Sequence, residues 1–279
     1  MNGTADELLI DADITLYQAT TSCEIETEWD TDLWTLTTDL AAAKAVFNSL
    51  LKQYQTKTDI KKFTLCFSSG RNFRKEINTD YKSNRKGRKP LGYGPLKEWA
   101  METYPSLVRD GLEADDVMGI WATQYPGKYV IVSLDKDMKG VPGRFFKLGI
   151  NGSKDEMHNI SVEDAREFFY SQVLMGDKVD GYSGIPGVGG KRAEGILRKG
   201  GVRWETVVEA YVKADLDEEY ALKMARMAKI LDASLYSNET NTVKLWTPEH
   251  DEELYGLHYS REELQTSRSD KDEDIIFFG

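Results

Sequence analysis

Three short apolar segments, each followed at once by a polar side chain, constrain the fold more than any other feature of the chain. They are Glu7–Ile10 before Asp11, Phe63–Phe67 before Ser68, and Tyr129–Leu134 before Asp135. Apolar runs of this length predict buried strands, and the helical patterns between them predict a parallel sheet. Because ligands bind beyond the carboxyl ends of parallel strands, these polar residues are expected to face one site.

The helical patterns divide the 279-residue chain into an α/β part and a helical part. Residues 1–160 are predicted to form an α/β core, with a mainly parallel central sheet flanked by helices on both sides. Residues 161–240 are predicted to be helical, and residues 241–279 to form a C-terminal extension with an acidic tail. Apolar spacing predicts helices at Leu40–Tyr54, Tyr93–Tyr104, Ala114–Tyr125, Val162–Met175, Ala193–Arg198, Trp204–Val212 and Glu219–Leu235.

Composition excludes several functional classes. No apolar run approaches ~20 residues and the N-terminus lacks a signal-peptide pattern, so we expect no membrane span and a cytoplasmic location. The two cysteines, Cys23 and Cys66, form no ligand or redox pair, which is typical of a reducing compartment. Only three histidines are present, which argues against histidine acid–base chemistry and against a His/Cys zinc site.

The charge of the chain is unevenly distributed. A formal net charge of −11 opposes binding to a phosphate backbone. One segment is nevertheless basic, with only Glu76 and Asp80 against Arg71, Arg74, Lys75, Lys82, Arg85, Lys86, Arg88 and Lys89. Basic residues close to an aromatic one suit single-stranded nucleic acid. A solvated basic loop is the alternative interpretation of this segment.

Carboxylates form four compact clusters. These are Asp11 with Asp13, Glu113 with Asp115 and Asp116, Asp135 with Asp137, and Asp177 with Asp180. Any one cluster alone is typical of helix capping or a turn. Several carboxylates at one sheet edge require cations, and oxygen ligands without His or Cys indicate Mg²⁺ or Mn²⁺. Two such ions suit phosphodiester hydrolysis, because one activates the attacking water and the other stabilises the leaving oxygen.

A glycine-rich stretch, Ser183–Gly195 (SGIPGVGGKRAEG), follows the last acidic cluster. It is not a nucleotide P-loop, because Arg192 stands where the hydroxyl residue is required and Ile185 where the first glycine is required. A dinucleotide fingerprint also fails, since no strand precedes the stretch. A tight hairpin between helices remains, in which the backbone of Gly187, Gly189 and Gly190 with Lys191 and Arg192 would hold a DNA phosphate. A plain interhelical turn is the alternative.

Together these motifs resemble the 5′-nuclease (flap endonuclease-like) superfamily, and most of all a bacteriophage 5′→3′ exonuclease. GLEADDV, SLDKDM and MGDKVDGYSGIPGVGGKRAEGIL carry the resemblance, which extends from about Leu8 to Leu235. It implies a PIN-like core, a helical arch at about residues 71–105, and a helix–three-turn–helix region that binds DNA. It also implies two divalent ions and a K⁺ ion held by hairpin carbonyls.

The resemblance assigns roles to individual residues. It implies metal ligation by Asp11, Glu113, Asp115, Asp116, Asp135, Asp137, Asp177 and Asp180. In the arch, it implies that Tyr81 stacks on a terminal base and that Lys82 and Arg85 meet the scissile phosphate as catalytic residues. Arg71 and Arg74 are expected to bind DNA beside them.

The chain departs from the family pattern at two positions. Ser68 stands where the family has an aspartate after the second strand, and we hypothesise that Asp13, or a water held by Ser68, replaces that ligand. Asp13 is expected on the same face of an extended strand as Asp11. The second departure is Gln172, near the position where some relatives have a lysine.

The sequence thus predicts a metal-dependent 5′→3′ exonuclease acting on duplex DNA, with flap or RNA-primer removal as further activities. The expected partners are DNA with 5′ ends or flaps, RNA–DNA hybrids, and a replication protein bound by the acidic tail; the chain is expected to be a monomer. The alternatives are a PIN-type ribonuclease and a catalytically weak structure-specific DNA-binding protein.

Overall fold

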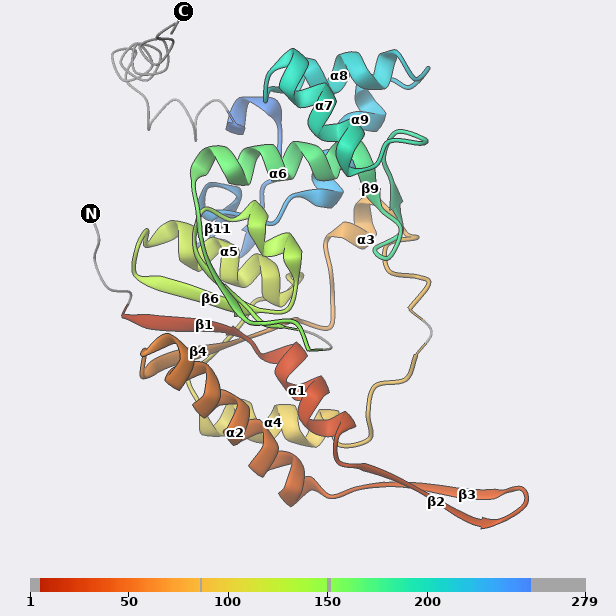
Figure 1. The fold of residues 1–279 in the computed structure, drawn as a ribbon, viewed down its shortest axis with the longest axis vertical. Coiled ribbons are helices and arrows are strands. Elements are labelled where there is room, and N and C mark those ends of the chain that lie inside the picture. Colours follow the sequence, from red (N-terminus) through yellow and green to blue (C-terminus); the bar gives the residue numbers. More distant parts are fainter. Residues whose placement is uncertain (1–5, 86, 150–151, 252–279) are drawn as a thin grey trace, which may run out of the picture.

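A six-stranded sheet lies at the centre of the computed structural model, which describes residues 6–85, 87–149 and 152–251 (Figure 1). The strand order is β5-β4-β1-β6-β7-β8, and only β8 runs antiparallel to its neighbour. The predicted mainly parallel sheet is therefore confirmed. The strands are β1 (Glu7–Asp11), β4 (Lys62–Phe67), β5 (Ser106–Val108), β6 (Tyr129–Ser133), β7 (Gly143–Lys147) and β8 (Glu156–Ile160).

Helices cover both faces of this sheet, because successive side chains of its central strands point to opposite faces. Leu8 and Ile10 pack into one buried cluster, while Leu9 between them packs into the other. The first cluster is covered by α1 (Ala12–Thr21), α2 (Leu40–Thr58) and α4 (Tyr93–Thr103), and the second by α5 (Ala114–Gln124) and α6 (Val162–Met175).

A helical region continues the second cluster. It contains the short hairpin β9 (Gly176–Asp177) and β10 (Tyr182–Ser183), followed by α7 (Gly190–Gly200), α8 (Trp204–Val212) and α9 (Glu218–Ala228). The Trp246 ring lies 5.2 Å from the rings of both Phe169 and Trp204. Because one buried cluster extends from Leu9 to Trp246, the change near residue 160 is a change of architecture within a shared core.

Several elements differ from the prediction. Asp11 is the N-cap of α1, so Asp13 lies in the first helical turn rather than on an extended strand. Helix α9 ends at Ala228 because the backbone becomes extended at Lys229, and the rest of the predicted helix contains only the 3₁₀ turn Ala233–Leu235. The sequence also gave no indication of α1, β5, β7, β8, the 3₁₀ turn Lys136–Gly140, the hairpin of β2 (Glu24–Asp30) and β3 (Leu33–Thr38), or β11 (Tyr236–Ser237) and β12 (Thr242–Val243).

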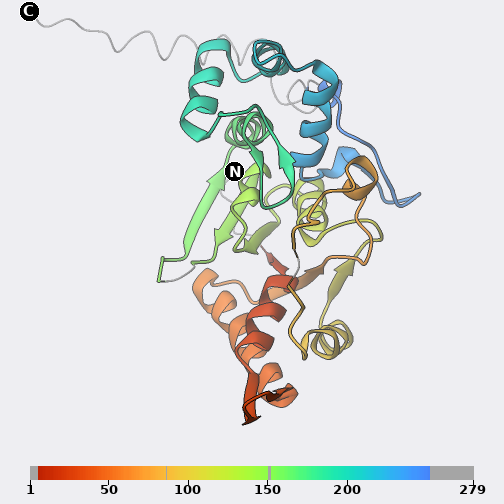
Figure 2. The same cartoon turned by 90° about the vertical axis from the view of Figure 1, so that its right-hand side faces the viewer.

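The basic segment crosses the carboxyl edge of the sheet. From α3 (Arg74–Ile77) it runs past β9 and β10 and then down to α4 (Figures 1 and 2). Residues 78–85 and 87–92 contain turns and irregular backbone but no helix, so this part of the predicted arch is not helical. These residues are called the strap. Helix α4 belongs to the layer of α1 and α2 instead, where Tyr93 and Leu96 are buried.

No helix in the described ranges combines the length and apolar character that a bilayer span requires. The predicted acidic tail lies outside the described residues, as does all of the C-terminal extension after residue 251.

Candidate active site

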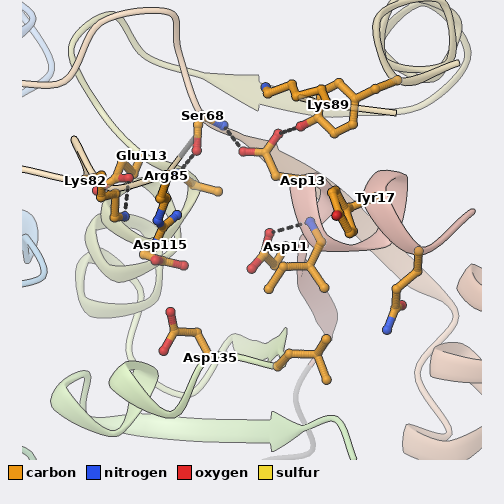
Figure 3. A pocket seen from close by; sticks show the side chains of 15 residues that line it. Asp11, Asp13, Tyr17, Ser68, Lys82, Arg85, Lys89, Glu113, Asp115 and Asp135 are labelled. Carbon is orange, nitrogen blue, oxygen red and sulfur yellow. Dashed lines mark hydrogen bonds and ion pairs between the residues drawn. The ribbon is translucent and has the colours of Figure 1, made fainter. Parts of the chain in front are cut away.

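Three aspartates from three different elements point toward one open space at the carboxyl edge of the sheet (Figure 3). Asp11 ends β1, Asp115 lies in the first turn of α5, and Asp135 follows β6. They line a pocket of about 450 Å³, to which Lys82 and Arg85 of the strap also contribute. The predicted convergence of strand-end carboxylates is therefore present.

Asp11 is held in a single orientation although it is only 4% exposed. Its carboxylate accepts hydrogen bonds from Ser133 Oγ at 2.8 Å and from the Ile14 N–H at 3.3 Å. Burial, and then repulsion from Asp13, raise the pKa of Asp11 to about 7. The protein thus maintains a carboxylate where ionisation is costly, which is typical of a site that receives a cation.

Helix α5 presents Glu113 and Asp115 to the site in different ways. Glu113 is the N-cap residue and accepts hydrogen bonds from Lys82 Nζ at 2.6 Å and Tyr81 Oη at 2.7 Å. Burial opposes its charge, but Arg74 and Lys82 lower the pKa of Glu113 to about 2. Burial and the nearby Asp135 and Asp11 instead raise the pKa of Asp115 well above its usual range.

A second acidic group lies beside the first. Asp137 accepts a hydrogen bond from Gln172 Nε2 of α6 at 2.7 Å. Burial, and then Asp135, raise the pKa of Asp137 to about 7, with smaller contributions from Asp177 and Asp180. A narrow second pocket is lined by Asp115, Asp135, Asp137 and Asp180, so the two groups share residues.

Asp13 joins the end of β4 to α1 and α4. Its carboxylate accepts hydrogen bonds from the Ser68 N–H at 2.8 Å and from Tyr93 Oη at 2.7 Å. The Ser68 hydroxyl accepts in turn from the Ala114 N–H of α5 at 3.0 Å. A carboxylate has about four acceptor positions, so Asp13 retains capacity on the wall of the pocket.

The structure contradicts two expectations, namely that Asp116 binds a metal ion and that Arg74 binds DNA. Asp116 is fully buried and forms a bidentate ion pair with Arg74, with N–O distances of 2.7 and 2.8 Å. Arg74 is only 3% exposed and also donates to the carbonyl oxygens of Met227 and Lys229. The pair therefore connects α3, α5 and the chain after α9, and neither side chain is free for a ligand.

The expectation that Tyr81 stacks on a base is also wrong for this conformation. Tyr81 is 2% exposed, and its hydroxyl lies 2.7 Å from a Glu113 oxygen and 3.3 Å from an Asp180 oxygen. Lys82 and Arg85, in contrast, line the larger pocket. Asp180 accepts a hydrogen bond from Arg85 Nη2 at 2.7 Å, and the Arg85 side chain is 55% exposed. Arg71 is more exposed still, at 68%.

The glycine-rich hairpin lies apart from these pockets. Gly187 has a φ of +74°, which favours glycine, and its carbonyl accepts from Arg192 Nη1 at 2.8 Å. Gly189 caps α7 and is exposed, as are Gly190 and Lys191. The hairpin therefore offers exposed backbone at a helix N-terminus together with a lysine.

The carboxylate oxygens of this site suit a hard divalent cation, although they do not converge on a single point. Among the residues that the structure describes, no three His, Cys, Asp or Glu side chains already form a complete ligand set. Burial, and then repulsion between neighbouring carboxylates, raise the pKa values of Asp11, Asp115 and Asp137, and a cation bound between them would offset both effects. Carboxylate oxygens are the ligands that Mg²⁺ and Mn²⁺ prefer.

Sequence reasoning missed two of the three residues that orient the carboxylates. Ser133, Tyr93 and Gln172 each donate to one aspartate, namely Asp11, Asp13 and Asp137. Gln172 was singled out only as a departure from the family pattern, whereas Tyr93 had no local signal because it is 80 residues from its partner.

Comparison with known proteins identifies this arrangement. Residues 7–144 match the family described as 5′-3′ exonuclease, N-terminal resolvase-like domain. The chain is 29% identical to an exodeoxyribonuclease of Enterobacteria phage T3 over 282 residues, which cover 86% of this chain and 92% of that protein. It is 30% identical to a 5′-3′ exonuclease of Aquifex aeolicus over 229 residues, which cover 73% of this chain and 75% of that protein.

The fold is also similar to a solved structure of the bacteriophage T5 D15 flap endonuclease in complex with DNA and metal ions. The TM-score is 0.58 at 14% identity, and the match covers 81% of this chain and 89% of that one. At this identity the likeness concerns the fold alone, whereas the sequence matches establish kinship. The chain belongs to the 5′-3′ exonuclease family, and its relatives include phage enzymes.

Proposed function

We propose that the protein is a divalent-metal-dependent 5′→3′ exonuclease that hydrolyses phosphodiester bonds of duplex DNA. One observation carries this proposal: Asp11, Asp115 and Asp135 point into a single pocket that Lys82 and Arg85 also line. Metal-dependent phosphodiester hydrolysis needs carboxylates that hold the metal ions, and basic side chains beside them can bind the phosphate. The names of the phage and bacterial relatives support the same activity, and we propose that it takes place in the cytoplasm of a bacterial or phage-infected cell.

We assign two metal positions to the carboxylates. Asp11, Asp115 and Asp135, with Glu113 and Asp13 at the rim, would hold one ion, and Asp137, Asp177 and Asp180 would support a second. Bound Mg²⁺ or Mn²⁺ would activate the attacking water and stabilise the leaving oxygen. The oriented side chains reduce the reorganisation that binding requires, because Ser133 and Gln172 already hold Asp11 and Asp137 in place.

The residues of the strap act on the substrate. In the free protein Lys82 and Arg85 are paired with Glu113 and Asp180, so a phosphate would compete with these carboxylates for the two cations. Their position over the pocket would orient the scissile phosphate for in-line attack. Release of the 3′-oxygen would then leave 5′-phosphate products.

The exposed hairpin of Gly189, Gly190 and Lys191 would hold the duplex by one phosphate backbone, without reading its sequence. Removal of flaps and of RNA primers would use the same site on a different 5′ end. The K⁺ ion at the hairpin, the replication partner of the acidic tail and the monomeric state stay predictions from the sequence.

One assay tests this function against its alternatives. A 5′-labelled DNA duplex, a flap substrate and an RNA–DNA hybrid are each incubated with and without Mg²⁺. We expect Mg²⁺-dependent release of 5′-phosphorylated products from duplex DNA. Cleavage of RNA alone would favour a PIN-type ribonuclease, and binding without cleavage would favour a structure-specific DNA-binding protein.

Variants separate chemistry from binding. Asp135→Asn and Asp177→Asn should each abolish turnover and leave DNA binding intact, because they remove a metal ligand and retain the shape. Glu163→Gln on the exposed start of α6 is the matched control and should cleave normally. Cleavage that survives either aspartate substitution would contradict the two-metal assignment.

A further inference from the structure

The hairpin of β2 and β3 projects from the body of the protein, beyond α1 and α2 (Figure 1). Among the described residues its strands pair with each other alone, as a two-stranded antiparallel sheet. It contributes no residue to the pockets at the carboxyl edge of the sheet. The proposed nuclease function therefore leaves this element without a role.

One face of the hairpin presents exposed large apolar side chains among threonines. The register pairs Ile25 with Thr37 and Thr27 with Thr35, and Trp29 Nε1 donates to Thr35 Oγ1 at 2.7 Å. Ile25, Trp29 and Leu33 are 55%, 67% and 57% exposed. Large apolar side chains gathered on one projecting face are typical of a surface that binds another molecule, and tryptophan often contributes most of the affinity there.

The hairpin is also strongly acidic. Between Glu24 and Asp39 the chain has no lysine or arginine, and its carboxylates are Glu24, Glu26, Glu28, Asp30, Asp32 and Asp39. The pairs Glu24–Thr38, Glu26–Leu36 and Glu28–Trp34 place three glutamates on the face opposite Trp29, beside Leu36 and the Trp34 ring, which is 51% exposed. Exposed apolar rings surrounded by carboxylates select an occupant that is both apolar and positively charged.

We propose that the β2–β3 hairpin is a docking surface for a protein segment that has basic side chains around an apolar face. DNA does not fit, because phosphates would meet these carboxylates, and an anionic bilayer is repelled for the same reason. A second copy would bring two acidic hairpins together, and the acidic stretch 269–274 of this chain has the same sign of charge.

The base of the hairpin is fixed to the strap. Glu24 accepts hydrogen bonds from Arg88 Nη1 and Nη2 at 2.8 and 3.1 Å, and from the Leu91 N–H at 2.8 Å. The docking surface is therefore attached to the segment that carries Lys82 and Arg85. A bound partner would be held beside the strap without covering the pocket.

A labelled peptide provides the test. The probe is a fluorescein-labelled amphipathic peptide of leucine and lysine, about 18 residues long, that forms a helix with one apolar face. The comparison peptides replace lysine by glutamate, or leucine by serine. Fluorescence anisotropy with the full chain should show saturable binding of the leucine–lysine peptide, at least about tenfold tighter than either comparison peptide.

Two variants test the two halves of the surface. Trp29→Ala removes the apolar anchor, and Glu26→Gln with Glu28→Gln removes charge while keeping the apolar face. Each should weaken peptide binding about tenfold or more, and both should cleave naked duplex DNA at the normal rate. Met157→Ala, an exposed apolar residue on β8 that is 46% exposed, is the control and should bind normally.

Four results would overturn the proposal. These are equal binding of the acidic and basic peptides, no saturable binding, slower cleavage of naked DNA by the hairpin variants, and a wild-type dimer that Trp29→Ala dissociates in sedimentation. The last two would reassign the surface to substrate or to a second copy. A failure of the nuclease function itself would appear in the Mg²⁺ assay and leave the peptide result unaffected.

Discussion

At the scale of single residues, neighbouring acids in the sequence have opposite roles. Asp115 points into the pocket without a hydrogen bond to any described residue, whereas Asp116 is satisfied by Arg74, the Leu231 N–H and the Glu113 N–H. Successive residues on a helix face about 100° apart, so one carboxylate serves the site and the next serves the core.

Removal of one partner of the buried Arg74–Asp116 ion pair should strongly destabilise the fold. Asp116→Asn removes the bidentate partner of the buried Arg74 guanidinium and leaves only the longer contact with Glu113 at 3.4 Å, which costs about 3–5 kcal/mol of the free energy of unfolding. Denaturant unfolding measures this loss. Arg71→Ala breaks two exposed ion pairs and should change the same quantity by less than about 1 kcal/mol. Equal losses in the two variants would contradict the structural role of Arg74.

Asp13 can act as a ligand or through the hydrogen bonds that it accepts, and two substitutions distinguish these roles. Asp13→Ala should raise the Mg²⁺ concentration needed for the half-maximal cleavage rate about tenfold or more, since it removes a carboxylate from the pocket wall. Tyr93→Phe removes only the hydroxyl that Asp13 accepts from. Its Mg²⁺ titration should shift less than that of Asp13→Ala if Asp13 is a ligand, because the carboxylate and its hydrogen bond from the Ser68 N–H remain. An unaltered titration for Asp13→Ala would exclude that assignment.

At the scale of elements, the strap is positioned by the β9–β10 hairpin. The Lys82 N–H donates to the Asp180 carbonyl at 2.9 Å, and Asn84 Nδ2 donates to the Lys178 carbonyl at 3.1 Å. Lys82 itself has a φ of +53°, a left-handed conformation that is uncommon for a residue with a side chain. The surrounding contacts therefore determine where its ammonium group lies.

Gly181 allows this close approach, and its substitution should displace the strap. A Cβ at Gly181 would lie 2.7 Å from the Asp80 carbonyl oxygen, so Gly181→Ala should move Lys82 and lower the cleavage rate about tenfold or more. Gly127→Ala is the matched control, because the φ of Gly127 is +82° against +79° for Gly181 and nothing lies within 4 Å of its Cβ position. Both variants carry the same backbone strain. Equal cleavage rates in single-turnover experiments would disprove the positioning role.

At the scale of the whole molecule, the acidic site makes stability depend on pH and on divalent ions. The pKa values of Asp11 and Asp137 are raised from 3.8 to about 7, mainly by burial. Between these values the folded protein binds more protons than the unfolded chain. The free energy of unfolding of the metal-free protein should therefore fall as the pH rises from about 4 to about 7. The lowered pKa of Glu113, about 2, acts only at lower pH, where its stabilisation is lost as the pH falls below about 4.5.

Thermal melts in EDTA and in Mg²⁺ measure this dependence. Mg²⁺ should raise the Tm at pH 8 and have little effect at pH 5, because the ion binds the ionised carboxylates. Asp11→Asn should reduce the decline of Tm with pH in EDTA. A Tm increase by Mg²⁺ of the same size at pH 5 and pH 8 would show that the ion binds elsewhere.

The sequence by itself determined the parallel sheet, its strand-end aspartates and the family. Apolar segments of four to six residues separated by helical patterns bury both faces inside such a sheet, and short acidic motifs follow the first and third of them directly. The convergence of Asp11 and Asp135 was therefore predictable, as were Val162–Met175 and Trp204–Val212, whose limits agree with the structure.

Only the tertiary structure decided which charged residues are available. The local sequence around Arg74 is typical of a DNA contact, and that around Asp116 is typical of a metal ligand. Both side chains are nevertheless buried, because residues 227–231, more than 100 positions further along the chain, pack against them. Tyr81 is covered by Asp180 and Glu113 in the same way. Local sequence specifies the periodicity of an element, whereas the burial of one side chain depends on segments that are distant in the chain.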